Sequence, residues 1–73
     1  MNIFDTKDFG KMIRAKRKAL GYTQAYVAEF TGFSTSFLSD LERGKETVEL
    51  GKAIYLANML GLDLTLTERD GEE

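Results

Sequence analysis

Four glycines divide the sequence into segments of helical period, and they constrain its fold more than any other feature. Gly21, Gly32, Gly44 and Gly61 each follow a stretch in which apolar residues recur every three or four positions. Glycine commonly ends a helix because it adopts the left-handed conformation without strain. The sequence has no proline, so these glycines are its main breaks. They predict a mainly α domain with four helices.

The residues that open each segment set the expected helix bounds. Asp, Thr and Ser side chains accept hydrogen bonds from the free amides of a first turn, and such residues stand at 5 or 6, 23, 34 and 47. We therefore expect helices that follow these caps and end at 20, 31, 43 and 60. Their inward residues are predicted to be Phe9, Met12, Ile13, Leu20, Val27, Ala28, Leu38, Leu41, Leu50, Ala53, Leu56, Ala57 and Leu60.

Residues 62–67 have a different period. They alternate strictly between leucine and a polar residue, which is typical of a half-buried β-strand. A lone strand leaves its backbone groups without partners, so it must pair either with residues 2–4 or with the same strand of a second copy. We favour pairing across a dimer, because the two copies match in length. The chain is thus predicted to be one domain, residues 1–73, with a helical core over 7–61, a dimerisation strand over 62–67 and an acidic tail over 68–73.

The fourth predicted helix also favours a dimer. It carries a second apolar face, which includes Val48, and a helix that is apolar on two sides is buried on two sides. The alternative is that this face only covers the edge of the core. With the strand, it gives a predicted dimer interface of Tyr55, Met59, Leu62, Leu64 and Leu66.

Composition excludes several kinds of chemistry. The sequence contains no cysteine and no histidine, which excludes disulfides, the zinc sites that use those ligands, and Ser–His or Cys–His nucleophiles. It has no glycine-rich phosphate loop and no apolar run of the roughly 20 residues that a membrane span needs. We expect a non-enzymatic cytoplasmic protein with no cofactor, no metal and no small-molecule substrate.

Charge is distributed unevenly along the chain. The net charge is −2, but residues 1–20 carry six basic and two acidic side chains, whereas residues 62–73 carry one basic and five acidic. The asymmetry is more informative than the sum. The basic N-terminal segment is compatible with nucleic-acid binding, although the net charge of the whole chain is negative.

The strongest functional signal is the spacing counted from Gln24. A short turn with glycine separates the second and third predicted helices, which is the signature of a helix-turn-helix. A small residue stands at the fifth position and glycine at the ninth, and apolar residues occupy the fourth, tenth, fifteenth and eighteenth. These residues are Ala28, Gly32, Val27, Phe33, Leu38 and Leu41.

On these residues, and on the stretch from Gly21 to Gly44, the sequence resembles the phage-repressor-like (Xre-type) helix-turn-helix family over residues 7–61. The resemblance implies a four-helix lambda-repressor-like domain of bacterial or phage origin that binds a palindromic DNA operator as a homodimer. With the added strand the chain is similar to HipB-like antitoxins. That similarity implies strand pairing across the dimer, repression of its own operon and binding of a HipA-type kinase toxin.

The predicted DNA contacts come from the third helix and its surroundings. Its first residues would face base edges in the major groove: Thr35, Ser36, Phe37, Ser39 and Asp40. Asp40 can accept from cytosine, or it can pair with Arg43 instead. Arg43 and Lys45 should lie near phosphates. The resemblance implies that Gln24 bonds a phosphate and buttresses the third helix, and that Arg17 pairs with Glu42 as a structural, partly buried ion pair.

Two functions fit these sequence features. The first is a dimeric repressor, whose partners are double-stranded DNA, a second copy and, if it resembles HipB, a toxin kinase. The second is a protein-interaction module, either an antitoxin or an adaptor, with weak or no specific DNA binding. The low net charge and the absence of Arg, Asn or Gln among the base-facing residues favour the second.

Overall fold

Four helices follow one another in the computed structural model, which describes residues 2–70. They are α1 (Thr6–Ala19), α2 (Gln24–Thr31), α3 (Thr35–Glu42) and α4 (Leu50–Met59). Each of the first three begins after a side chain that accepts from a first-turn amide: Asp5, Thr23 and Ser34. The bounds of α2 match the prediction, and α1 and α3 each end one residue earlier than expected.

Helix α4 is shorter than predicted. It begins at Leu50 instead of Val48 and ends at Met59 instead of Leu60. The residue that precedes its first turn is Glu49, which makes no side-chain capping bond, so the predicted cap at Thr47 is wrong. The prediction for the helix ends themselves is confirmed, because Gly21, Gly32, Gly44 and Gly61 all have positive φ.

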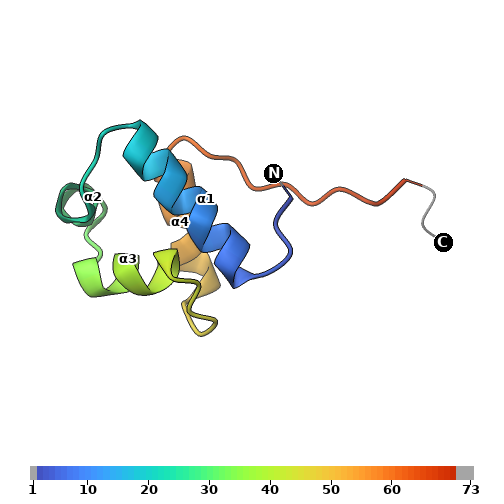
Figure 1. The fold of residues 1–73 in the computed structure, drawn as a ribbon, viewed down its shortest axis with the longest axis horizontal. Coiled ribbons are helices and arrows are strands. Elements are labelled where there is room, and N and C mark those ends of the chain that lie inside the picture. Colours follow the sequence, from blue (N-terminus) through green and yellow to red (C-terminus); the bar gives the residue numbers. More distant parts are fainter. Residues whose placement is uncertain (1, 71–73) are drawn as a thin grey trace.

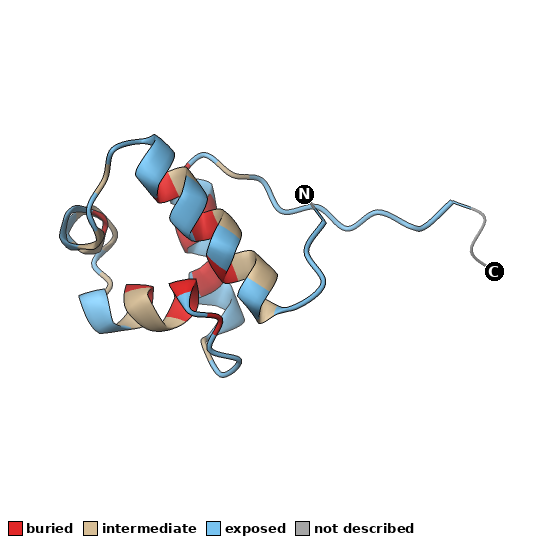
Figure 2. Cartoon of the chain, viewed as in Figure 1, coloured by how far each residue is buried: buried red, intermediate tan, exposed pale blue. Residues whose placement is uncertain are grey.

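The core lies where the four helices meet. Figure 1 shows α1 in front of α4, with α3 below them and α2 at one side; the red buried positions of Figure 2 face inward between these helices. Every helix contributes at least one buried apolar side chain, and each fully buried leucine, isoleucine or valine stabilises the fold by about 1.5–3 kcal/mol. The buried set is Ile13, Val27, Leu38, Leu41, Ala53, Leu56, Ala57 and Leu60.

Two predicted core residues are exposed instead. Leu20 caps the C-terminus of α1, and Leu50 is the first residue of α4, where 69% of it remains exposed. Both lie at helix ends, beyond the region where all four helices pack. Conversely, Val48, which the sequence places on the second apolar face, and Leu62, which it places in the dimer interface, are half-buried against the core.

The C-terminal segment does not form the predicted strand. Within residues 2–70 the structure contains no β-strand, and residues 62–69 run as an extended chain that leads away from the helices (Figure 1). Neither residues 2–4 nor any other described part of the chain supplies a ladder partner. The radius of gyration is 12.9 Å, against about 11 Å for a compact chain of this length, because the segment projects outward.

No helix of the described chain is long and apolar enough to cross a membrane.

Candidate nucleic-acid interface

Helices α2 and α3 form a tight helix-turn-helix. Gly32 has a φ of 80°, a conformation in which glycine avoids strain, and its amide donates to the carbonyl of Ala28 at 2.9 Å. Val27 and Leu38 are fully buried on the two helices, so the pair is anchored to the core. The spacing counted from Gln24 therefore produces the predicted motif.

The inner side of α3 is fixed by a buried ion pair. Arg17 on α1 donates from Nε to Glu42 Oε2 at 2.6 Å and from Nη2 to Glu42 Oε1 at 2.9 Å. Its Nη1 donates to the carbonyl of Tyr22 at 2.8 Å. The two residues are 8% and 9% exposed. The predicted structural pair is therefore present, and it is bidentate.

The hydrogen bonds to Glu42 raise the pKa of Arg17, with its carboxylate charge acting in the same direction and burial in the opposite one. The guanidinium therefore stays charged at any working pH. Bidentate geometry adds strength and orientation to such a pair. The pair thus sets the position of α3 relative to α1.

Gln24 joins this arrangement from the start of α2. Its Nε2 donates to Glu42 Oε1 at 3.1 Å, so the predicted buttressing of α3 is seen directly. An amide nitrogen carries two hydrogens, and one remains for a phosphate. The phosphate contact itself stays a prediction.

A close backbone approach between α1 and α3 was missed by the sequence analysis. A Cβ atom on Gly10 would clash with the carbonyl oxygens of Leu41 and Glu42, the latter at 2.6 Å. The Thr6 hydroxyl donates to the carbonyl of Gly44 at 2.8 Å at the end of the same seam. Glycine weakens a helix, so a glycine in the middle of a predicted helix indicates a position where packing leaves no room for a side chain. This was the only sequence signal for the contact.

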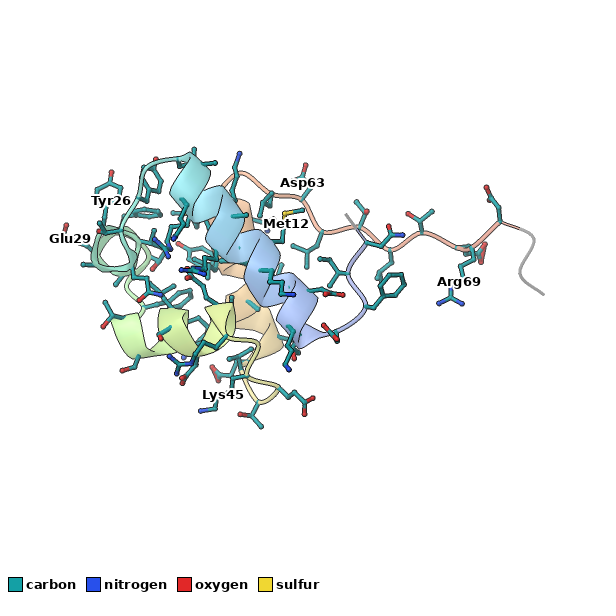
Figure 3. All side chains as sticks on the ribbon, viewed as in Figure 1. Met12, Tyr26, Glu29, Lys45, Asp63 and Arg69 are labelled. Carbon is teal, nitrogen blue, oxygen red and sulfur yellow. The ribbon has the colours of Figure 1, made fainter. Side chains whose placement is uncertain are left out.

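The outer side of α3 is exposed at its N-terminus. Thr35 and Ser36 are exposed there, and Ser39 and Asp40 are half-buried further along. These four residues follow one another along the helix, as the prediction of a base-facing surface requires. Arg43 and Lys45 lie at the other end, just beyond α3 (Figure 3 labels Lys45).

Asp40 binds both of these cations. Its Oδ1 accepts from Arg43 Nη2 at 2.8 Å, and its Oδ2 accepts from Lys45 Nζ at 3.3 Å. Arg43 Nη1 also donates to the Ser39 hydroxyl. The predicted alternative, a local pair between Asp40 and Arg43, is present in the free chain. The contact of Asp40 with a base stays a prediction.

Phe37 is turned away from the exposed residues of α3. Its ring lies 4.9 Å from that of Phe33, and Phe33 in turn meets Tyr55 of α4 edge to face at 5.7 Å. Lys52 Nζ lies 5.7 Å from the Phe37 ring centre. Phe37 is half-buried against the core, so the structure does not bring it together with Thr35 and Ser36. Its predicted base contact is untested.

The predicted dimer residues divide into two groups. Tyr55, Met59, Leu64 and Leu66 are exposed, but Leu62 packs against its own core. Leu62 is also held by a hydrogen bond from its amide to the carbonyl of Ala57 at 2.9 Å. Its own chain therefore already covers part of this side chain, and its place in a dimer contact stays a prediction. The four exposed side chains have no comparable cover.

Within residues 2–70, no group of three or more His, Cys, Asp or Glu side chains is placed to hold a metal ion.

Comparisons with known proteins agree with this geometry. Residues 13–66 match a helix-turn-helix family model. The chain is 32% identical over 59 residues to the HTH-type transcriptional regulator y4mF of Sinorhizobium fredii, covering 81% of this chain and 78% of that protein. It is 31% identical over 64 residues to the ImmF control region 10 kDa protein of Bacillus phage phi105, covering 88% of this chain and 71% of that protein.

Solved structures share the fold. The HipB–O2 20mer complex of a HipB variant matches with a TM-score of 0.85 at 22% identity, covering 93% of this chain and 94% of that chain. The HipA–HipB–O2–O3 complex matches with a TM-score of 0.84 at 20% identity, covering 93% and 96%. Both likenesses describe the four-helix architecture.

Proposed function

The chain belongs to the Xre-type helix-turn-helix family of DNA-binding transcriptional regulators, and from that premise we propose that it is a repressor that binds a palindromic operator as a homodimer. One observation carries the proposal. Helix α3 is locked on its inner side by Arg17 and Glu42, while its outer side presents exposed hydroxyls followed by two cations. A rigid helix with a polar exposed face is what major-groove entry requires.

In this proposal the contacts divide by chemistry. Thr35, Ser36 and Ser39 meet base edges, where hydroxyls donate or accept. Arg43, Lys45 and the second amide hydrogen of Gln24 meet phosphates, which position the helix without reading sequence. The first-turn amides of α2 and α3 add to the attraction for phosphate. Because few bidentate base contacts are available, specificity depends in part on DNA shape. The proposal assigns the chain no catalytic activity and no cofactor.

The proposed dimer places two such helices about 34 Å apart, one helical turn of DNA. Tyr55, Met59, Leu64 and Leu66 are the exposed apolar residues that a twofold contact would cover. Pairing of residues 62–67 with the same segment of a second copy would supply the ladder that the single chain lacks. Repression is then steric, because the dimer occupies the operator.

We further propose that the chain is an autoregulatory antitoxin of a HipA-type kinase. The proposal is supported by the close likeness of fold to HipB, including HipB in a complex with HipA. In that role the repressor occupies the operator of its own operon and also binds the toxin.

Selection from a random duplex DNA library at physiological salt tests the repressor proposal. We expect enrichment of a palindrome with half-sites one helical turn apart, and binding that weakens steeply as salt rises, because phosphate contacts dominate. Enrichment of no sequence, or a flat response to salt, would contradict the proposal.

The second candidate function is a protein-interaction module with weak or no specific DNA binding. The exposed leucines of the extended C-terminal segment favour it, since Leu64 and Leu66 contact no core in the single chain. Two results together would support this function over repression. The wild-type chain would capture a partner protein that the variant with both leucines changed to lysine does not capture, and the duplex library would show no enrichment.

A further inference from the structure

We propose that Asp40 determines the specificity of DNA binding by competing with DNA for Arg43 and Lys45, an inference that rests on the proposed function. Both cations that the repressor needs for phosphates are already bound in the free chain. Asp40 holds one with each carboxylate oxygen, at 2.8 Å and 3.3 Å. The carboxylate thus occupies the place that a phosphate would take.

The two ion pairs are exchangeable. The side chain of Asp40 is 31% exposed, that of Arg43 70% and that of Lys45 56%. Ion pairs this exposed contribute little to the stability of the fold, so phosphate oxygens can replace the carboxylate without disturbing it. The Ser39 hydroxyl, which accepts from Arg43, keeps the guanidinium near α3 during the exchange.

The exchange leaves Asp40 with its charge on the face of α3 that enters the groove. No other basic side chain is paired with it within residues 2–70. A carboxylate without a cation is repelled by the surrounding phosphates. A hydrogen bond from a base is the one interaction that can replace the two ion pairs it has lost. In the major groove the cytosine amino group is such a donor. Asp40 therefore lowers affinity for arbitrary DNA and spares sites with cytosine at its position.

The two alternatives for Asp40, an ion pair with Arg43 or a contact with a base, then belong to different states of the protein. Asp40 pairs with the cations in the free chain and accepts from a base in the bound one. The ion pairs of the free chain make the base contact selective, because they are lost on any DNA. A DNA site without a hydrogen-bond donor at this position then leaves the carboxylate without a partner. Removing the carboxylate is therefore expected to relax specificity and to strengthen binding to arbitrary DNA.

The matched control is Glu46, in the loop before α4. It carries the same charge one residue from Lys45 and is exposed, and it forms no ion pair in the described chain. Glu46→Gln and Asp40→Asn therefore change the net charge equally, and only Asp40→Asn removes the competitor.

The experiment compares wild type, Asp40→Asn and Glu46→Gln as full chains, after denaturant unfolding shows that each is folded. Each is titrated onto a random-sequence duplex, and each is used to select from a random duplex library. We expect Asp40→Asn to bind the random duplex about tenfold tighter than wild type, which is the size of the discrimination at one base pair. We also expect it to lose a cytosine preference that wild type shows in each half-site. Glu46→Gln should keep that preference and gain much less affinity.

Four outcomes would count against the inference. The inference is overturned if Asp40→Asn and Glu46→Gln bind the random duplex with equal affinity. It is also overturned if the cytosine preference persists in Asp40→Asn. Failure of wild type to bind any duplex overturns the proposed function, and the inference with it. Tight wild-type binding with no change in Asp40→Asn overturns the inference alone.

Discussion

Asp40 and Glu42 are carboxylates two residues apart on the same short helix, yet they lie in opposite environments. Two residues turn a helix by about 200°, so one faces outward and the other inward. Glu42 is 9% exposed and accepts from Arg17 and Gln24. Asp40 accepts from two exposed cations beyond the helix end. Burial, and not the chemistry of the group, decides which carboxylate holds the fold and which is free to exchange partners.

The inner contact is the more demanding of the two. A buried charge is tolerated only when its hydrogen-bonding capacity is met, and no buried side-chain polar atom of the described chain lacks a partner. The outer contact has no such requirement because water can replace either cation. We therefore expect substitutions on the inner side to act on folding and substitutions on the outer side to act on recognition.

The largest effect should come from Glu42→Ala. It leaves the Arg17 guanidinium buried without its partner, so we expect the unfolding free energy to fall by about 3–5 kcal/mol. Chemical denaturation of the full chain measures this. Replacing both residues with apolar ones, Arg17→Met with Glu42→Leu, should cost less than the single change, because no charge is then left unpaired. If Glu42→Ala lowers the unfolding free energy by less than about 1 kcal/mol, the pair contributes no more than an exposed surface ion pair does.

Gly10→Ala should have the next largest effect. The added methyl group meets the carbonyls of Leu41 and Glu42 and forces α1 away from α3, with an expected loss of about 1–3 kcal/mol. Gly51→Ala is the control, since nothing lies within 4 Å of its added Cβ. That change should stabilise α4 by up to ~1 kcal/mol. Equal effects of the two changes on the denaturation midpoint would mean that the α1–α3 seam is not closely packed.

Asp40→Asn should change stability much less than Glu42→Ala. It weakens two exposed ion pairs, so the unfolding free energy should fall by at most about 1 kcal/mol. Thermal unfolding of the two variants side by side measures the difference. A loss comparable to that of Glu42→Ala would remove the distinction between the two sides of α3.

The smallest effect on the folded monomer should come from Leu64→Lys with Leu66→Lys. Both leucines are exposed, so the unfolding free energy of the monomer should stay within about 0.5 kcal/mol. Self-association should be lost, because the charges cannot be buried between two copies. Sedimentation of wild type and variant over a range of concentrations measures this. Unchanged self-association would exclude residues 62–67 from the dimer contact.

Much of the inner architecture could be predicted from the sequence. The glycine breaks gave four helices, and the offsets from Gln24 located the motif and its buried residues. The Arg17–Glu42 pair followed from the family resemblance. The close approach at Gly10 could not be predicted, since a glycine within a helical pattern does not say which neighbour requires it. Leu20 and Leu50 fit the apolar period, but periodicity does not show where the shared core ends.

The outer features depended on information that a single sequence lacks. The alternation over residues 62–67 correctly indicates an extended segment, but a strand needs a ladder partner that this chain alone does not provide. Phe37 is at the right helical position for a base contact, but packing with Phe33 turns it toward α4. The simultaneous binding of Arg43 and Lys45 by Asp40 involves a residue beyond the helix end, where helical spacing gives no guidance.

The most direct test of the central claim is duplex binding by the variant Arg43→Glu with Lys45→Glu, measured beside its unfolding. Lys11→Glu with Arg14→Glu makes the same charge change on exposed residues of α1 and serves as the control. Charge reversal at 43 and 45 is expected to abolish binding at physiological salt, while the unfolding free energy stays within about 1 kcal/mol of wild type. The control variant is expected to retain most of the binding. Duplex binding at the wild-type level after reversal at 43 and 45 would contradict the assignment of DNA recognition to the outer side of α3.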